Sequence, residues 1–503
     1  MKILNKAIRN AAVRIFGLSA AFAILTMTAC EEALETKVFS QISPDNFFKT
    51  EADFNVAVVT LYNPFGTEWG ANDVGNGSWY NHLHNANVAS YYLRGELITD
   101  EMEPPGPGNL SQFNWGQSTF GNDGVYAKIR FVARATSTIQ SMSESTAVPD
   151  AIRNRYIAEA KTLRAWMMYV LYDFYGPVNA KWDPEILTDS EVLPRPSEEI
   201  YIAQIEKDLT EAIPDLGDRY NGDSNNWGRA SKGLARMLLL KLYMNTKQWA
   251  KAEPVAREVM NMGYSLIPEY ADVFTEERNN EVIFAIACNV AIGARNWYPQ
   301  HLFPGDFASS SIITRGPGWY SYRMPWEFYD TFDPSDKRRN TIITSYTNAS
   351  DETVNRDTGF EGPIPLKYVG ISGPGPEYGA DWVIYRYADV LLSLAEIVNE
   401  LNNGPTTEAY GLVGEVRGRA GLNNITEGMT QAQFSNALLA ERGRELFAEG
   451  VRRQDLIRHG KFIEHAQSRG EDLAQPHHVR FPIPNAAILE GGEEQIVAQN
   501  PGY

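Results

Sequence analysis

The sequence predicts a mostly α-helical fold, in which tetratricopeptide-like helical pairs form a scaffold that carries long ordered loops and a few short strands. Two observations support this prediction. Apolar residues recur at helical spacing in segments that come in pairs, as in repeats of about 34 residues built from two helices. The stretches between the pairs are rich in Gly, Pro, Asn and aromatic residues, and aromatic residues make up 12% of the chain.

The first helix of the predicted scaffold begins at Ser43. Ser43 is a good N-cap, Pro44 suits the first helical turn, and Asp45 places an acid near the positive end of the helix. An apolar stripe then continues through Phe54 and Leu61 at helical spacing. The stripe indicates a helix with one buried face.

Four helical pairs follow along the chain. Stop signals such as Gly176-Pro177 and Gly263 separate the helices, and Ser197 caps a new one. Thr430 begins the last pair and has Gln433 three residues later, which is a capping box. The predicted pairs are 152–175 with the helix that Ser197 caps, 232–245 with 250–262, 385–401 with 407–419, and the helix from Thr430 to Phe447 with 452–458.

Long irregular stretches lie between the predicted helices, at 64–124, 177–196, 263–383 and 460–503. Loops of such length in a compact protein are usually functional or disordered. Their high content of Trp and Tyr argues against disorder. We therefore expect large ordered loops that are held by the helical scaffold.

The N-terminal 29 residues have the layout of a secretory signal peptide. Basic residues from Lys2 to Arg14 precede an apolar run that ends in small residues before Cys30. The run is too short to cross roughly 30 Å of hydrocarbon. A cysteine at this place looks like a bacterial lipoprotein acylation site, so we expect cleavage after residue 29, a lipid anchor on Cys30 and a tether over 30–43. A plain secreted protein is the alternative.

The charge and the motifs exclude several classes of function. A formal net charge of −18 disfavours binding to nucleic acid and to anionic lipid. The sequence contains no phosphate loop, no dinucleotide fingerprint and no Gly-x-Ser-x-Gly motif, and no cysteine and acid cluster completes a metal set. We expect no cofactor and no metal. The second cysteine, Cys288, ends a strand-like apolar run and is expected to be buried.

Three glutamates, Glu441, Glu445 and Glu449, fall on one face of a predicted helix. Five arginines lie close enough in sequence to pair with them: Arg442, Arg444, Arg452, Arg453 and Arg458. Glycoside cleavage needs two carboxyl groups that face each other across a cleft, about 5 to 10 Å apart. A single helix face does not supply that arrangement, so we expect a network of ion pairs.

Several segments, in this order, resemble the SusD/RagB family, the surface nutrient-binding lipoproteins of Bacteroidetes-type bacteria. The resemblance runs from Cys30 to Tyr503. Its most specific pieces are AEAKTLRAW at 158–166, YRYADVLLSLAE at 385–396, ERGRELFAEGVRRQDLIR at 441–458 and the end of the chain from Phe481 to Tyr503. It implies one SusD-like domain over 44–503, with an N-terminal part to about 265 and a C-terminal RagB/SusD part from about 266.

The resemblance also implies a function. Such a protein would sit on the outer membrane and face the cell exterior, bind oligosaccharide or polysaccharide without catalysis, and deliver it to a SusC-type TonB-dependent transporter. Binding of a peptide, as in RagB, is the alternative, and a glycoside hydrolase is a third reading. The family does not preserve the residues that contact the ligand, so no site residue is transferred from it.

The aromatic residues of the loops suggest where a sugar would bind. Sugars present apolar C–H faces and hydroxyl edges, so proteins hold them with aromatic rings and with nearby amides or carboxylates. The alternative is that these rings pin the loops to the scaffold. Trp79 and Trp319 are the best candidates for stacking. The full set of predicted ligand-binding residues is Trp69, Trp79, Tyr80, Asn81, Trp297, Tyr298, Trp319 and Tyr320.

Overall fold

The computed structural model describes residues 47–67, 82–85, 90–106, 108–119, 122–292, 294–308, 318–368, 379–490 and 496–503. Thr50 to Tyr503 form one compact unit, to which all elements named below belong. Cys30, the tether and four predicted ligand-binding residues (Trp69, Trp79, Tyr80 and Asn81) lie outside the described residues.

The described elements are mostly helices. They are α2 (Glu51–Tyr62), α3 (Tyr91–Glu96), α4 (Asn122–Tyr126), α5 (Ile129–Glu144), α6 (Asp150–Tyr175), α7 (Glu198–Ala212), α8 (Lys232–Asn245), α9 (Trp249–Met260), α10 (Asp272–Thr275), α11 (Tyr298–Leu302), α12 (Trp326–Tyr329), α13 (Tyr387–Leu401), α14 (Thr407–Arg419), α15 (Gln431–Leu446), α16 (Arg452–Arg458), α17 (Phe462–Ser468) and α18 (Asn485–Glu490). The strands are β1 (Val282–Ile286), β2 (Ile342–Ile343), β3 (Ser345–Thr347), β4 (Thr353–Asn355), β5 (Ile364–Pro365) and β6 (Trp382–Arg386).

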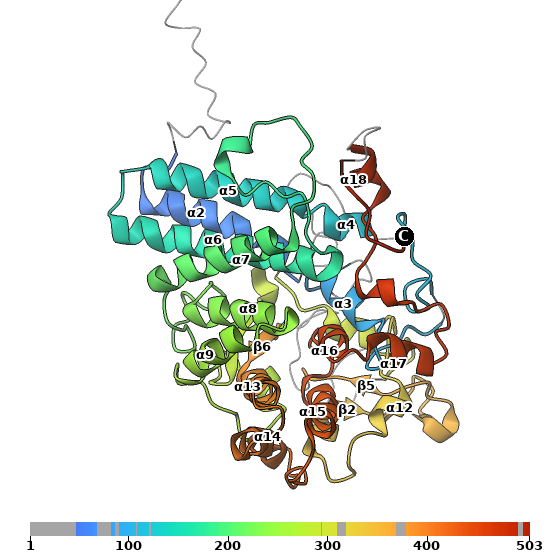
Figure 1. The fold of residues 1–503 in the computed structure, drawn as a ribbon. Coiled ribbons are helices and arrows are strands. Elements are labelled where there is room, and N and C mark those ends of the chain that lie inside the picture. The colour runs from blue at the N-terminus through green and yellow to red at the C-terminus, as the bar shows by residue number, and fades with distance from the viewer. Residues whose placement is uncertain are drawn as a thin grey trace, which may run out of the picture. The chain divides into compact units, whose positions relative to one another are not determined.

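The long helices form a continuous stack. Each helix of the series α5, α6, α7, α8, α9, α13 and α14 packs on the next, and α15 packs on α13. Figure 1 shows this series descending from α5 to α14. The pairs α8 with α9 and α13 with α14 are the helical hairpins that the sequence predicts, so the mostly helical fold class is confirmed.

Capping residues predict the start of a helix accurately where no other local or long-range interaction overrides them. The hydroxyl of Ser231 accepts from the amide of Leu234 at the start of α8, and the predicted capping box of Thr430 and Gln433 is present at α15. The core of the upper stack includes Trp166, which is 1% exposed and stacks on Phe65 with ring centroids 4.4 Å apart. A ring of this size contributes much of the apolar burial around it.

Two predicted helix starts are wrong. The helix expected from Ser43 begins at Glu51, because Thr50 forms a capping box with Asp53. The helix expected from Tyr385 begins at Tyr387, because the preceding residues form β6. That strand pairs antiparallel with β1, from Ile286 opposite Trp382 to Val282 opposite Arg386. Cys288 follows β1 and is buried, as predicted.

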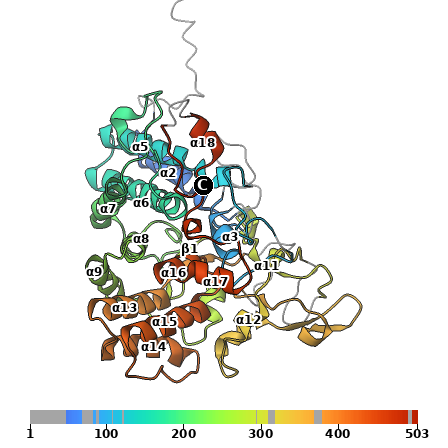
Figure 2. The ribbon, with the colours of Figure 1, turned by 45° about the vertical axis from the view of Figure 1, so that its right-hand side comes forward.

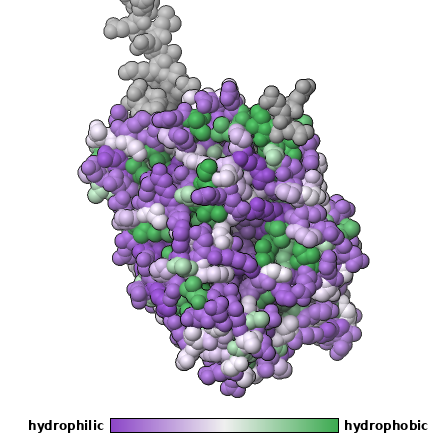
Figure 3. Space-filling view, viewed as in Figure 1, coloured by the Kyte–Doolittle hydropathy of each residue, from purple (hydrophilic) through white to green (hydrophobic). Residues whose placement is uncertain are grey.

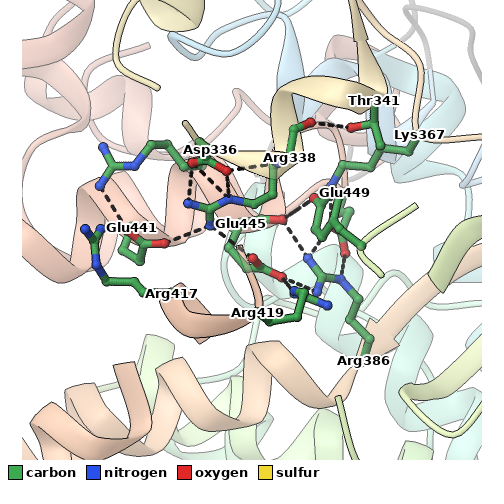
Figure 4. A network of polar contacts seen from close by, with 12 residues as sticks. Asp336, Arg338, Thr341, Lys367, Arg386, Arg417, Arg419, Glu441, Glu445 and Glu449 are labelled. Carbon is green, nitrogen blue, oxygen red and sulfur yellow. Dashed lines mark hydrogen bonds and ion pairs between the residues drawn. The ribbon is translucent and has the colours of Figure 1, made fainter. Parts of the chain in front are cut away.

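The predicted ion-pair network exists, and it is buried (Figure 4). Arg338 contacts Glu441 at 2.7 Å and Glu445 at 3.0 Å, and Arg386 contacts Glu445 at 2.5 Å and Glu449 at 2.7 Å. The four side chains of Arg338, Arg386, Glu441 and Glu445 have no exposed surface. The network also includes Glu281, Asp336, Lys367, Arg417 and Arg419.

The predicted partners of the three glutamates were largely wrong. Glu449 lies beyond the end of α15, because the chain turns at Ala448 with φ +55°. Among the five arginines predicted to pair, Arg444 contacts Glu441 at 3.1 Å. The other four bind other acids of the described chain: Arg442 contacts Asp389 and Asp455, Arg452 contacts Asp100, Arg453 contacts Asp173, and Arg458 contacts Glu396.

The C-terminal residues are tied to the end of α6. Arg195 donates to the carbonyl oxygen of Tyr175 and to the side chain of Asn500, both at 2.8 Å. Asn500 in turn donates to the carbonyl oxygens of Tyr175 at 3.0 Å and Phe481 at 2.8 Å. These bonds give the last motif of the sequence a structural role, since they close the chain against the scaffold.

We expect the substitution Glu445→Ala to destabilise the protein strongly. It would leave Arg338, Arg386 and Arg419 with too few counter-charges in a buried site, a loss of about 3 to 5 kcal/mol. Urea denaturation measures the change. The matched control is Glu464→Ala, which breaks an exposed ion pair with Lys461 and should leave stability nearly unchanged. Equal effects of the two substitutions would contradict the structural role of the network.

A second buried pair of acids predicts a pH dependence. Burial raises the pKa of Glu96 from 4.5 to about 7, and burial together with the charge of Glu96 raises the pKa of Glu101. A carboxyl whose pKa is higher in the folded chain favours folding while it is protonated. The stability it contributes is complete below about pH 4.5 and is lost as the pH rises to about 7.

The substitution Glu96→Gln should remove most of this loss of stability with rising pH, which is on the order of 3 kcal/mol. The free energy of unfolding is measured in urea at pH 4.5, 6 and 7.5. Glu427→Gln, at an exposed position, is the control and should keep the wild-type pH dependence. A decline of the same size in the Glu96→Gln protein would exclude Glu96 as its source.

Candidate functional site

The predicted aromatic residues that the structure describes lie around the short helix α11. Trp297 immediately precedes α11, and the segment 318–324 runs back along it. Three backbone hydrogen bonds fix this segment: Trp319 to Gln300 at 2.9 Å, Tyr320 to Phe303 at 3.0 Å and Ser321 to His301 at 2.7 Å. Figure 2 shows α11 and α12 on the side of the molecule away from the stacked helices.

Three rings form what we call the indole platform: Trp319, Trp297 and His301. The side chain of Trp319 is 47% exposed, while Trp297 beneath it is 8% exposed. The two indoles stack with centroids 5.5 Å apart and an angle of 17° between their planes. The imidazole of His301 meets Trp319 edge-on at 4.7 Å. One flat apolar face is thus held open to solvent on a layer of buried rings.

His301 keeps the platform uncharged. Burial lowers the pKa of His301 from 6.5 to about 3, so its imidazole is neutral at physiological pH. Its Nδ1 atom lies 3.0 Å from the hydroxyl of Ser321, and its ring stacks on Tyr322 at 5.7 Å. These contacts orient the ring that supports the edge of Trp319.

Tyr298 does not belong to the exposed surface. It is 1% exposed, and its ring packs edge-on against Tyr92, Trp382 and Tyr368. Successive residues at the start of a helix are turned by about 100° around its axis, so the side chains of Trp297 and Tyr298 point in different directions. In this structure Tyr298 is a core residue, and the prediction that its ring is available to a ligand does not hold.

Tyr320 is partly exposed and has an unusual backbone. Its φ angle of +45° lies in the left-handed region, which a non-glycine residue rarely adopts. Burial raises the pKa of Tyr320 to about 12. The turn at Tyr320 directs Trp319 outward while the next residues return to the core, and backbone strain of this kind gathers at functional sites.

The structure therefore brings Trp297, Trp319 and Tyr320 together and separates Tyr298 from them. His301 is not among the residues predicted from the sequence. A usable signal was present, because His301 follows Trp297 by four residues, and residues four apart on a helix lie on the same face.

A cleft of about 560 Å³ opens close to the platform, between α12, α17 and the segment 97–103. We call it the acidic cleft, because the acids among its lining residues outnumber the basic residues, Arg469 and His465. The backbone of Glu103, on its wall, pairs with that of Arg323 through hydrogen bonds of 2.9 and 3.0 Å. Arg323 follows Trp319 by four residues, so its backbone lies within about 14 Å of that of Trp319, and Glu103 lies about 5 Å beyond Arg323. The acids that line the cleft are Asp100, Glu103, Glu327 and Glu471.

The described residues do not contain a group of three or more His, Cys, Asp or Glu side chains arranged to hold a metal ion. A search of the same residues finds no helix with the length and apolar character needed to cross a membrane.

Comparisons with known proteins agree with this architecture. The model of the SusD family matches residues 360–503. SusD-like protein P25 of Formosa agariphila is 26% identical, with 96% of this chain and 98% of that protein covered. The chain belongs to the SusD/RagB family.

Two further relatives of this SusD/RagB chain have a stated ligand. The starch-binding protein SusD of Bacteroides thetaiotaomicron is 22% identical, with 86% of this chain and 87% of that protein covered. A solved structure of surface glycan-binding protein A from the same organism, in complex with laminarihexaose, has a TM-score of 0.69 and 21% identity and covers 89% of this chain and 98% of that chain.

We expect the His301 imidazole to stay neutral from pH 5 to 8. With a pKa of about 3, its protonation begins only in stronger acid. The Cε1 carbon shift of labelled histidine, followed by NMR, should remain constant over this range, and the His301→Gln variant assigns the signal. A titration midpoint between pH 5 and 8 for this signal would contradict the buried, neutral imidazole.

Proposed function

We propose that this SusD/RagB-family protein is a cell-surface lipoprotein that captures an oligosaccharide or polysaccharide and delivers it to a SusC-type TonB-dependent transporter. The observation that carries the proposal is the exposed indole of Trp319, which is supported from below by Trp297 and from the side by His301. Its ligand is a glycan that stacks one sugar face on this indole.

The chemistry of the platform suits a sugar. An indole face accepts the C–H face of a pyranose ring, and the polar residues around it can bind the hydroxyl edges. The face shown in Figure 3 is mainly hydrophilic, with small separate hydrophobic patches. Among the large apolar residues that are exposed in the described part of the chain, Trp319 is the aromatic one, and its stack on Trp297 keeps its indole in place.

The relatives support the same class of ligand. One is named as a starch-binding protein, and another was solved with laminarihexaose, so both names refer to glucose polymers. For this chain the proposal extends to glycans as a class. A few stacked rings give micromolar to millimolar affinity, about −8 to −4 kcal/mol, which suits a protein that must also release its ligand.

The proposal includes anchoring to the outer membrane through acyl chains on Cys30. The basic start, the apolar run and the cysteine after it support this part. Incorporation of labelled palmitate and the presence of the protein in the membrane fraction test it, with Cys30→Ser as the control. Co-purification with a TonB-dependent transporter tests the partner.

Peptide binding is the main alternative within the family. A peptide site relies on backbone hydrogen bonds and charged pockets, whereas the platform offers a flat aromatic face. Glycoside hydrolysis is the second alternative. Release of reducing ends from a polysaccharide incubated with the protein would contradict a purely binding function.

We expect Trp319→Ala to weaken glycan binding about tenfold or more, equivalent to about 1.4 kcal/mol, because the stacking face is lost. Affinity electrophoresis against a panel of polysaccharides identifies the ligand, and calorimetry gives its dissociation constant. Trp319→Phe, which keeps an aromatic ring, should retain part of the affinity.

Ile200→Ala is the control, since Ile200 is an apolar residue of α7 that is 57% exposed outside the platform. It should bind as the wild type does. The proposal fails if Trp319→Ala binds as tightly as Ile200→Ala while both variants stay folded.

A further inference from the structure

We propose that the acidic cleft selects the chemical class of the glycan: it binds sugar units that donate hydrogen bonds, amino sugars above all, and rejects sugars that carry carboxylate or sulfate groups. This inference rests on the proposed function, since the cleft would hold the part of the glycan next to the unit stacked on Trp319. Its volume of about 560 Å³ is that of a pocket for a small ligand.

The hydroxyl groups of the cleft act as acceptors toward a ligand. Thr331 donates its proton to the carbonyl oxygen of Phe328 at 2.7 Å, and Ser468 donates to that of His465 at 2.9 Å. A hydroxyl whose proton is engaged can still accept through its lone pairs. The oxygen atoms of both hydroxyls can therefore accept a hydrogen bond from a ligand.

Two of the four carboxyl groups already have an arginine partner. Asp100 receives two hydrogen bonds from Arg452, at 2.8 and 2.7 Å, and lies 3.5 Å from His465. Glu103 lies 3.1 Å from Arg323, which also contacts Glu361 at 3.0 Å. Both acids therefore have a cationic partner, and they mainly shape the wall of the cleft.

The other two acids, Glu327 and Glu471, make no ion pair with any described residue. Burial raises the pKa of Glu471, a sign that its carboxyl is partly withdrawn from water. The cation that faces them in the cleft is Arg469, which donates to the carbonyl oxygen of Ile98 at 3.4 Å. The side chains that line the cleft therefore carry more negative than positive charge, with four acids against Arg469 and the imidazole of His465.

The floor of the cleft is apolar. Leu97, Met102 and Phe328 line it and are all buried. Apolar side chains below and acceptors at the rim match the two sides of a sugar ring, namely its C–H face and its hydroxyl or ammonium groups. An anionic sugar would place its charge beside unpaired carboxylates in a partly enclosed space, which is unfavourable.

The experiment compares three hexasaccharides by calorimetry at pH 6 and low salt: a glucosamine hexamer, laminarihexaose and a galacturonic acid hexamer. The expected order of affinity is amino, neutral and acidic, with at least about a tenfold difference between the first and the last. The Glu327→Gln/Glu471→Gln double variant keeps the size of both side chains and removes their charges. It should reduce that ratio at least threefold.

The matched control is the Glu191→Gln/Glu427→Gln double variant, which removes the same charge at exposed positions outside the cleft lining. It should keep the wild-type ratio, since the general negative charge of the chain acts equally in both variants. If both double variants change the ratio equally, or if the acidic hexamer binds as tightly as the amino hexamer, the inference is overturned.

The outcomes separate the two proposals. If Trp319→Ala weakens binding of laminarihexaose while the cleft variants change nothing, the proposed function stands and the cleft inference falls. If none of the three hexamers binds, the cleft inference falls, and the proposed function falls with it if the polysaccharide panel also yields no ligand. A tetralysine peptide that binds more tightly than the glucosamine hexamer, with the same loss in the cleft variant, would also overturn the inference in favour of a basic peptide.

Discussion

Buried arginines and glutamates near the end of α15 join the two parts of this structure. Glu441, Glu445 and Glu449 come from α15 and the turn after it, whereas Arg338 comes from the loop region and Arg386 from the scaffold side. Each arginine contacts more than one acid, so a movement of either part would leave charges unpaired in a fully buried site. The network therefore makes the position of the loop region dependent on the helical stack.

In this network, burial raises the pKa of a carboxyl group and neighbouring arginines lower it. At Glu445 the arginines together have the larger effect. Burial alone would raise the pKa of Glu445, but the guanidinium groups of Arg419, Arg386 and Arg338 hold it at about 2. The carboxylate is thus ionised throughout the neutral range, and its contribution to stability is lost only as the pH falls from about 4.5 to about 2. Glu96 shows the opposite balance, because its surroundings supply too little positive charge to offset burial. A lowered and a raised carboxyl pKa occur in the same protein because the arginines are concentrated around α15.

The sequence predicted what local interactions determine. The bounds of α8, α14 and α16 agree with the prediction, because caps and apolar stripes act within one or two turns. The strand before α13 was missed, since its pairing with β1 joins residues about a hundred positions apart. The partners of the three glutamates were missed for the same reason, because Arg338 and Arg386 lie far from them in sequence, whereas the neighbouring Arg442 points to Asp389 and Asp455.

The candidate site, too, was predicted only as far as neighbouring residues in the sequence determine it. Composition grouped Trp297, Tyr298, Trp319 and Tyr320, but only the fold decides that Tyr298 enters the core and that Trp319 returns to stack on Trp297.

Rigid support matters for a binder of flexible glycans. A ligand that loses internal freedom on binding leaves little free energy for ordering the protein as well. Trp297, His301 and three backbone hydrogen bonds place the indole of Trp319 before any ligand arrives, so binding requires no further ordering of this ring. The exposed indole is therefore an effective contact because the residues that hold it are buried.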